Sequence, residues 1–220
     1  VDILDRLIEQ QEDPKRKAKF SYTAAVIIRD KIGDPETAVE YFDRALDNDI
    51  EHLPAFEAID RIFTEMKEWK GLERAYRRML RPIAENDEAA MEEVKFKLWE
   101  GLGEIYRSRL GHPKSAYQAF ETAVGLQPDN ERIRLILAEL SKKTENVEGV
   151  IEQHKKLIEH DPFRIESYKE LFRVYLEANK YDRAWCMAAA LTFLEKASEE
   201  ERRIYEQYRG KSLRKAKANL

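Results

Sequence analysis

The sequence predicts an all-α protein, built as a right-handed solenoid of antiparallel helix pairs. Three observations predict it: related segments recur at a fixed spacing, apolar residues follow a helical period, and residues that break helices are few. The 220 residues include only 8 Gly and 7 Pro. Turns must therefore be few and short, which disfavours a sandwich or barrel of strands. Charged residues make up 37% of the chain, which suits a thin architecture in which every helix keeps one face in water.

The repeat is clearest between residues 31–46 and residues 109–124, which share glycine, proline, alanine and phenylalanine at matching places. Intermediate units place five anchors at one helix position, with spacings of 34, 44, 34 and 34: Ala38, Leu72, Ala116, Val150 and Ala184. Four residues after the anchors stand Phe42, Tyr76, Phe120, His154 and Ala188. A phase kept over five units predicts about five repeats, because chance would not preserve it.

One unit carries an almost complete family pattern. Its residues are Trp99, Leu102, Gly103, Tyr106, Ala116, Phe120, Ala123 and Pro128. This unit resembles the tetratricopeptide repeat (TPR) family, with one extra residue before Ala116. The second unit keeps Phe56, Ile59, Phe63 and Tyr76. The resemblance covers roughly residues 15–197 and implies a TPR-like superhelix in which Trp99 is a large buried aromatic.

The phase divides the chain into predicted repeats at approximately 15–52, 53–86, 87–129, 130–163 and 164–197. Residues 1–14 are expected to be the second helix of a truncated preceding repeat, and residues 198–220 a C-terminal capping helix. On this interpretation the chain is a helical-repeat domain excised from a larger protein. The 44-residue spacing is explained by a turn at residues 85–87 and a long first helix over 88–109.

Helix ends are predicted from residues that cap or break helices. Gly33 and Gly111 suit the position just past a helix, and a proline two residues later suits the first position of the next one. The expected N-terminal caps are Asp34, Asp129 or Asn130, Asn146, and Ser198 in a capping box with Glu201.

The sequence offers no catalytic constellation, so we expect no enzyme activity and no cofactor or metal. His154 and His160 are six residues apart, so they point to different sides of a helix and do not form a metal pair. His154 is expected to pack in place of an aromatic side chain. Cys186 is expected to be a buried, inert thiol.

Charge gives little support to nucleic acid as a partner, because 39 basic residues against 43 acidic ones leave a net charge of −4. Five basic residues lie between Arg209 and Lys217; a solvent-facing end of the last helix explains them more simply than an electrostatic contact. No apolar run is long enough for membrane insertion. The compartment stays open, with a soluble cytoplasmic protein favoured.

In the TPR family the first helices of successive pairs line a concave groove that receives a peptide or a partner helix. The resemblance therefore implies a partner-binding groove formed by Tyr22, Arg29, Glu57, Arg61, Lys97, Glu104, Arg107, Arg132, Lys169 and Arg173. The lining is mixed in charge, and its arginines suit acidic groups of the partner. Lys169 matches one position of the carboxylate clamp of some TPR domains, but Arg173 stands where that clamp has Asn, so a chaperone-tail clamp is not expected.

The function predicted from the sequence is a protein–protein interaction scaffold. The alternatives are an RNA-associated helical-repeat protein and a non-catalytic arm that presents a substrate to a larger enzyme. The sequence leaves open the partner's identity, the choice between the concave and the convex face, and homo-oligomerisation.

Overall fold

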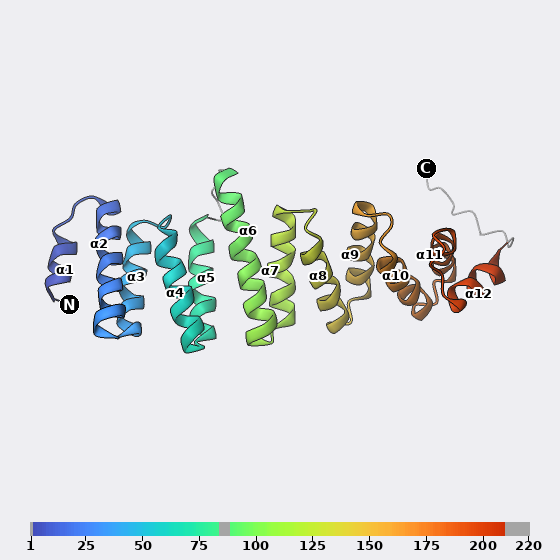
Figure 1. Ribbon diagram of the computed structural model, residues 1–220, viewed down its shortest axis with the longest axis horizontal. Helices are drawn as coiled ribbons and strands as arrows, with labels where there is room; N and C mark the ends of the chain where they lie inside the picture. The colour runs from blue at the N-terminus through green and yellow to red at the C-terminus, as the bar shows by residue number, and fades with distance from the viewer. Residues whose placement is uncertain (1, 84–88, 210–220) are drawn as a thin grey trace. The chain divides into compact units, whose positions relative to one another are not determined.

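A computed structural model of the chain describes residues 2–83 and 89–209 (Figure 1). Within these residues the chain forms twelve α-helices and two π-helical segments, and it has no strand. The helices are α1 (Asp2–Glu9), α2 (Pro14–Ile27), η1 (Ile28–Ile32), α3 (Pro35–Asn48), α4 (Leu53–Met66), α5 (Trp69–Ile83), α6 (Ala89–Glu104), η2 (Ile105–Leu110), α7 (Pro113–Leu126), α8 (Glu131–Lys143), α9 (Val147–His160), α10 (Ile165–Glu177), α11 (Tyr181–Phe193) and α12 (Glu199–Tyr208). The predicted all-α architecture is confirmed.

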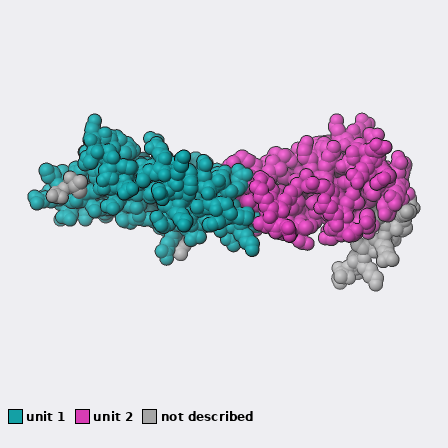
Figure 2. Space-filling model, turned by 90° about the horizontal axis from the view of Figure 1, so that it is seen from below, with its two compact units in different colours: residues 1–119 teal, residues 120–220 magenta. Residues whose placement is uncertain are grey.

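The chain divides into two compact units, residues 1–119 and 120–220 (Figure 2). Inside the first unit each helix from α1 to α6 packs on the next one along the chain. Inside the second unit the same holds from α8 to α12. Packing between sequence neighbours is how a repeat protein buries apolar faces that no single pair could cover.

The predicted borders of the individual repeats stay a prediction. The expected turn at residues 85–87 and residues 210–220 of the expected C-terminal helix lie outside the described residues. The described part of that last helix, α12, ends at Tyr208.

The predicted helix caps are confirmed where the structure describes them. The Asp34 carboxylate accepts a hydrogen bond from the backbone N–H of Thr37, and the side chains of Asn130 and Asn146 cap α8 and α9 in the same way. Ser198 opens α12 with a reciprocal capping box. These bonds satisfy backbone donors that the first turn of a helix leaves without a partner.

The extra residue before Ala116 is absorbed by a π-helical turn, η2, and the equivalent place in the first unit holds η1. The N–H of Gly33 donates to the carbonyl of Ile28 at 2.9 Å, five residues back. A π-turn takes in one residue without ending the helix. Both turns stop at a left-handed glycine, Gly33 at φ 77° and Gly111 at φ 65°, where a side chain would be strained.

The repeat anchors form the core. Ala38, Ala116 and Ala184 are completely buried, as are Phe42 and Phe120 four residues after the first two. Trp99 was predicted to be buried, but the structure has it partly exposed. Its neighbours Leu98 and Leu102 are buried side chains of α6. The family pattern located the helix correctly but overstated the burial of its largest side chain.

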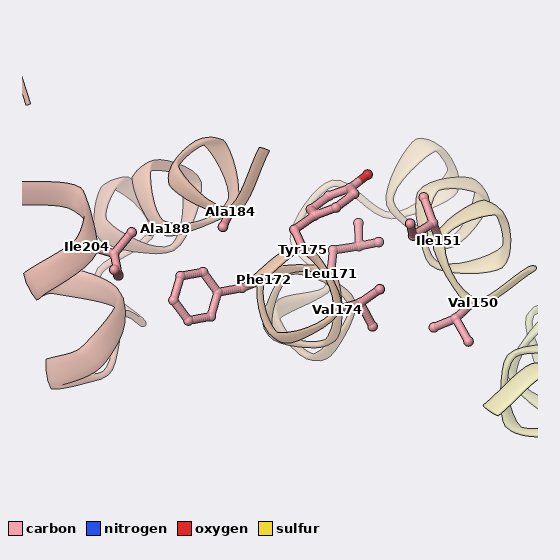
Figure 3. Close-up of a cluster of buried hydrophobic side chains, with 9 residues drawn as sticks. All are labelled: Val150, Ile151, Leu171, Phe172, Val174, Tyr175, Ala184, Ala188 and Ile204. Carbon is pink, nitrogen blue, oxygen red and sulfur yellow. The ribbon is translucent and has the colours of Figure 1, made fainter. Parts of the chain in front are cut away.

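In the second unit α10 lies at the centre of the core (Figure 3). Its side chains Leu171 and Val174 lie toward α9, and Phe172 points toward α11 and α12. Ala184 and Ala188 leave room for that ring because they carry only a methyl group. Burying side chains on both sides makes α10 the element that joins α9 to the C-terminal helices.

His154 is buried as predicted and takes the place of an aromatic ring in α9. Its Nδ1 lies 3.1 Å from the hydroxyl of Ser167 in α10. Burial lowers the pKa of His154, and the positive charges of Lys142, Arg164 and Arg173 lower it further against the opposing effect of Glu170. The imidazole is therefore held neutral in the folded protein.

In the first unit α5 and α6 approach closely at Gly101. A Cβ on Gly101 would lie 2.5 Å from Cε1 of Tyr76. That ring is fixed from two sides, because it packs edge-on against Phe56 with centroids 4.9 Å apart and donates a hydrogen bond to Asp60 at 2.9 Å. The absence of a side chain at Gly101 is thus a packing requirement.

Gly101→Ala is expected to destabilise the protein by roughly 1–3 kcal/mol, because the methyl group must displace a ring that is already held in place. Urea unfolding followed by circular dichroism measures this loss. The matched control is Gly125→Ala in α7, where nothing lies within 4 Å of the added Cβ. The control should be neutral or gain up to about 1 kcal/mol from helix propensity. Equal effects of the two substitutions would contradict the packing argument.

The free energy of unfolding should fall as the pH drops below 6.5, the ordinary pKa of histidine. The reason is that the unfolded chain protonates His154 at a higher pH than the folded protein does, so acid favours unfolding. His154→Phe, which restores the aromatic residue of the repeat, should reduce this dependence, whereas His160→Gln at an exposed histidine should not. Urea unfolding at pH 7.5 and at pH 5.5 measures this dependence. If the free energy of unfolding changed equally between the two pH values in both variants, the prediction would be contradicted.

Candidate partner-binding face

The candidate site lies on the first helices of the pairs: α2 with η1, α4, α6 with η2, α8 and α10. All ten residues predicted to bind a partner lie on these helices, seven in the first unit and three in the second. The exposed ones are Glu57, Arg61, Lys97, Arg132, Lys169 and Arg173. The partly buried ones are Tyr22, Arg29, Glu104 and Arg107.

Two of the predicted residues are tied to the protein's own aromatic core. The ring of Tyr22 on α2 lies 5.5 Å from that of Phe42, measured between centroids. The guanidinium of Arg29 in η1 lies 5.9 Å from the Phe42 ring and donates to Asp30 at 2.6 Å. Both side chains therefore support α3 from the first helix, and only part of each faces solvent.

Several predicted cations are already paired within the chain. Arg107 lies 3.0 Å from Glu104, and Lys97 lies 3.2 Å from Glu93. In these i, i+3 and i, i+4 pairs each partner screens the other, so neither side chain presents a bare charge to a ligand.

In the second unit Arg173 and Lys142 share one carboxylate, that of Glu170, at 2.7 and 2.6 Å. Partial burial would raise the pKa of Glu170, but the hydrogen bonds and positive charges of Lys142 and Arg173 lower it. Glu170 is thus ionised and joins α8 to α10. Arg173 also borders a cavity of about 450 Å³ whose wall includes Val147 and Val174. Arg173, which was predicted to bind a partner, is thus paired with Glu170 three residues earlier on the same helix.

The structure brings Glu57 and Arg61 together at one cavity of about 510 Å³ between α4 and α5. Its lining is Phe56, Glu57, Asp60, Arg61, Thr64, Glu65 and Tyr76. Of these residues only Asp60 and Tyr76 are hydrogen-bonded to each other. This is the place where predicted partner-binding side chains stand around an open concavity.

Asp60 was missed in the sequence although a signal was present. When Phe56 is aligned with Trp99, Asp60 falls where the third unit has Gly103, at a position that faces the second helix. Tyr76 stands where Phe42 and Phe120 stand, so its hydroxyl requires an acceptor on that neighbouring helix. Burial and the adjacent Asp60 raise the pKa of Tyr76, which keeps the phenol a hydrogen-bond donor.

The described residues hold no group of three or more histidine, cysteine or acidic side chains placed to bind a metal ion. None of their helices combines the length and the apolar character needed to cross a membrane. Cys186 differs from the prediction, because it is exposed on α11. The neighbouring alanines of its helix face the core instead, so the run of small residues in this helix did not predict correctly whether the Cys186 thiol is buried.

Repeated helix pairs that pack on their sequence neighbours define the chain as a helical-repeat protein. Residues 96–130, which span the second half of α6 and all of η2 and α7, match the family model described as tetratricopeptide repeat. The match covers one repeat unit of the chain, and the packing of each helix on its sequence neighbours within each compact unit gives the described remainder the same helical-repeat architecture.

Superkiller protein 3 of Schizosaccharomyces pombe is 24% identical to the chain over 204 residues, which cover 74% of the chain and 14% of that protein. The solved structure titled MamA AMB-1 aligns at a TM-score of 0.51 with 15% identity, covering 84% of this chain and 95% of that one. YrrB, titled a TPR protein, aligns at a TM-score of 0.48 with 15% identity, covering 94% of this chain and 97% of that one. The chain therefore spans about a seventh of the curated relative, and the similarity to MamA extends to the fold.

Because Cys186 is exposed, the folded protein should react with an aromatic disulfide reagent such as DTNB and release one equivalent of thiolate. The rate should lie close to that of the urea-unfolded chain. Cys186→Ser, which removes the single cysteine, provides the baseline. A thiol that reacts only after unfolding would contradict the exposed placement.

Proposed function

We propose that the chain is a protein-interaction scaffold that binds an extended peptide or a partner helix along the exposed face of its first helices. The observation that carries the proposal is the cavity between α4 and α5, where Glu57 and Arg61 stand on the face that the family uses for binding. Charged side chains on rigid helices suit recognition, because the backbone that positions them loses little freedom when a ligand arrives. The step from fold to function rests on analogy with the family.

Charge complementarity is the expected source of specificity. Arg61 in the first unit and Lys169 in the second are exposed, and neither forms an ion pair within the described residues. Such groups can pair with a ligand without first breaking an internal salt bridge. Arg107 and Arg173 would have to release Glu104 and Glu170 before they could do the same.

Arg61→Glu with Lys169→Glu is therefore expected to abolish capture of a partner from a lysate of the source organism. The matched control is Lys114→Glu with Lys155→Glu, which makes the same charge change at exposed positions of the second helices α7 and α9. We expect the recovered partner to fall at least tenfold in the first variant and to stay within twofold in the control, quantified by mass spectrometry.

Circular dichroism must show that both variants are folded. Equal recovery by the native protein and the first-helix variant would move the binding surface away from this face. Loss in the control as well would indicate a general dependence on net charge instead of a binding face.

A further inference from the structure

Three tyrosines of the first unit donate their hydroxyl to a carboxylate on a neighbouring helix. Tyr41 of α3 donates to Asp5 of α1 at 2.7 Å. Tyr106 of η2 donates to Glu73 of α5 at 2.6 Å. Tyr76 of α5 donates to Asp60 of α4 at 2.9 Å. The same chemical arrangement therefore occurs three times between packed helices.

At Tyr41 the arrangement is completed by an arginine. Arg44 donates to Asp5 at 2.6 Å, and its guanidinium lies 4.5 Å from the centroid of the Tyr41 ring. The cation thus pairs with the carboxylate and contacts the face of the aromatic ring, two interactions that a guanidinium combines well.

At Tyr106 an arginine again completes the arrangement. Arg77 lies 2.9 Å from Glu73, and its Nε also donates to the Tyr106 hydroxyl at 3.1 Å. A carboxylate that accepts a bond from a neutral phenol keeps its negative charge, which explains why a cation is drawn to both places.

The third pair, Tyr76 with Asp60, has no arginine. Asp60 forms no ion pair in the part of the chain that the structure describes, and it borders the cavity between α4 and α5. Glu57 and Glu65, which also line the cavity, likewise form no ion pair among the described residues. The positive charge of Arg29 interacts electrostatically with Glu65, but Arg29 is itself hydrogen-bonded to Asp30. The carboxylates of the cavity therefore face solvent, whereas the carboxylates bonded to Tyr41 and Tyr106 face a guanidinium of the chain.

The charge of the lining indicates which ligand fits. Three carboxylates, on Glu57, Asp60 and Glu65, stand against the single guanidinium of Arg61. An acidic group would meet a net negative wall, whereas a cation would gain electrostatic attraction and contact with the aromatic rings of Phe56 and Tyr76.

We infer that the cavity between α4 and α5 binds an arginine side chain of the partner, whose guanidinium pairs with Asp60 and lies against the Tyr76 ring. The inference rests on the proposed function and names the chemistry that the face recognises. Arginine is favoured over lysine because its planar fork can pair with Asp60 and still lie flat on the ring. Glu57 and Glu65 line the same cavity and add attraction for the same cation.

The test begins with the selection of random 12-residue peptides, displayed on phage, on the immobilised full chain. We expect the selected peptides to be enriched in arginine. The strongest one is then synthesised with a fluorescent label, and its Kd is measured by fluorescence polarisation beside versions in which arginine is replaced by lysine or by citrulline. Citrulline keeps the shape of arginine and removes its charge, so the Kd of the citrulline peptide should be at least tenfold higher. The Kd of the lysine peptide should lie between those of the arginine and citrulline peptides.

Protein variants test the same contact from the other side. Asp60→Asn removes the charge but keeps an acceptor for Tyr76, and it should raise the Kd at least tenfold. Glu57→Gln with Glu65→Gln should raise it three- to tenfold, and being exposed, these positions can be altered with little risk to folding. Glu36→Gln with Glu40→Gln, an equal charge change at exposed positions of α3, should leave the Kd within twofold.

The outcomes separate the inference from the proposed function. Selected peptides that lack arginine, or that bind Asp60→Asn and Glu57→Gln/Glu65→Gln as tightly as the native chain, would overturn the arginine pocket. If those peptides still lose affinity with Lys169→Glu, a substitution outside the cavity, the binding face itself stands. Failure to select any peptide would overturn both.

Discussion

The structure depends on one constraint, the close approach of neighbouring helices at positions where a side chain is small or absent. Ala38, Ala116 and Ala184 are completely buried at the anchor position of their units, and Gly101 leaves no space for even a methyl group beside Tyr76. Each helix can then cover the apolar face of the next, and aromatic rings such as Phe42 and Phe120 fill the remaining volume. Within each unit these contacts join helices that follow one another in the chain, which is how a repeat protein buries its apolar faces.

Polar groups refine this packing. The hydroxyls of Tyr41, Tyr76 and Tyr106 each bond a carboxylate on an adjacent helix, so a ring can be buried while its polar end is satisfied. Two of these carboxylates are also neutralised by an arginine of the chain. Exposed ion pairs contribute little to stability, so their main effect here is to decide which charges remain available to a ligand.

Some of the charges on the first helices are already paired within the chain. Glu104, Glu170 and Arg173 are engaged with neighbours in the chain, whereas Glu57, Asp60 and Arg61 surround an open cavity without an ion pair among the described residues. A scaffold whose charges are partly paired within the chain can discriminate among partners, because a ligand gains most where it meets a charge without an internal partner. The similarity to proteins of known structure supports the fold, and the contacts of these particular side chains carry the argument for a binding site.

Much of the fold could be predicted from local patterns. The spacing of Ala38, Ala116 and Ala184 set the phase of the helices, and Gly33 and Asp34 marked where one helix ends and the next begins. Such features act over a few residues, so a single sequence displays them directly. The burial of Trp99 and Cys186 was predicted incorrectly, because it depends on how far a neighbouring helix extends over each side chain.

The sequence by itself determined the class of fold, the rhythm of its helices and the set of first-helix residues available for binding. Only the tertiary structure decided which charges are paired between helices, since Lys142 of α8 reaches Glu170 of α10, the carboxylate that Arg173 of the same helix also binds. It also decided that Tyr76 reaches Asp60, a carboxylate that forms no ion pair among the described residues. The physical reason is that helix formation is governed by local residues, whereas the partner of a long charged side chain is fixed by packing between helices.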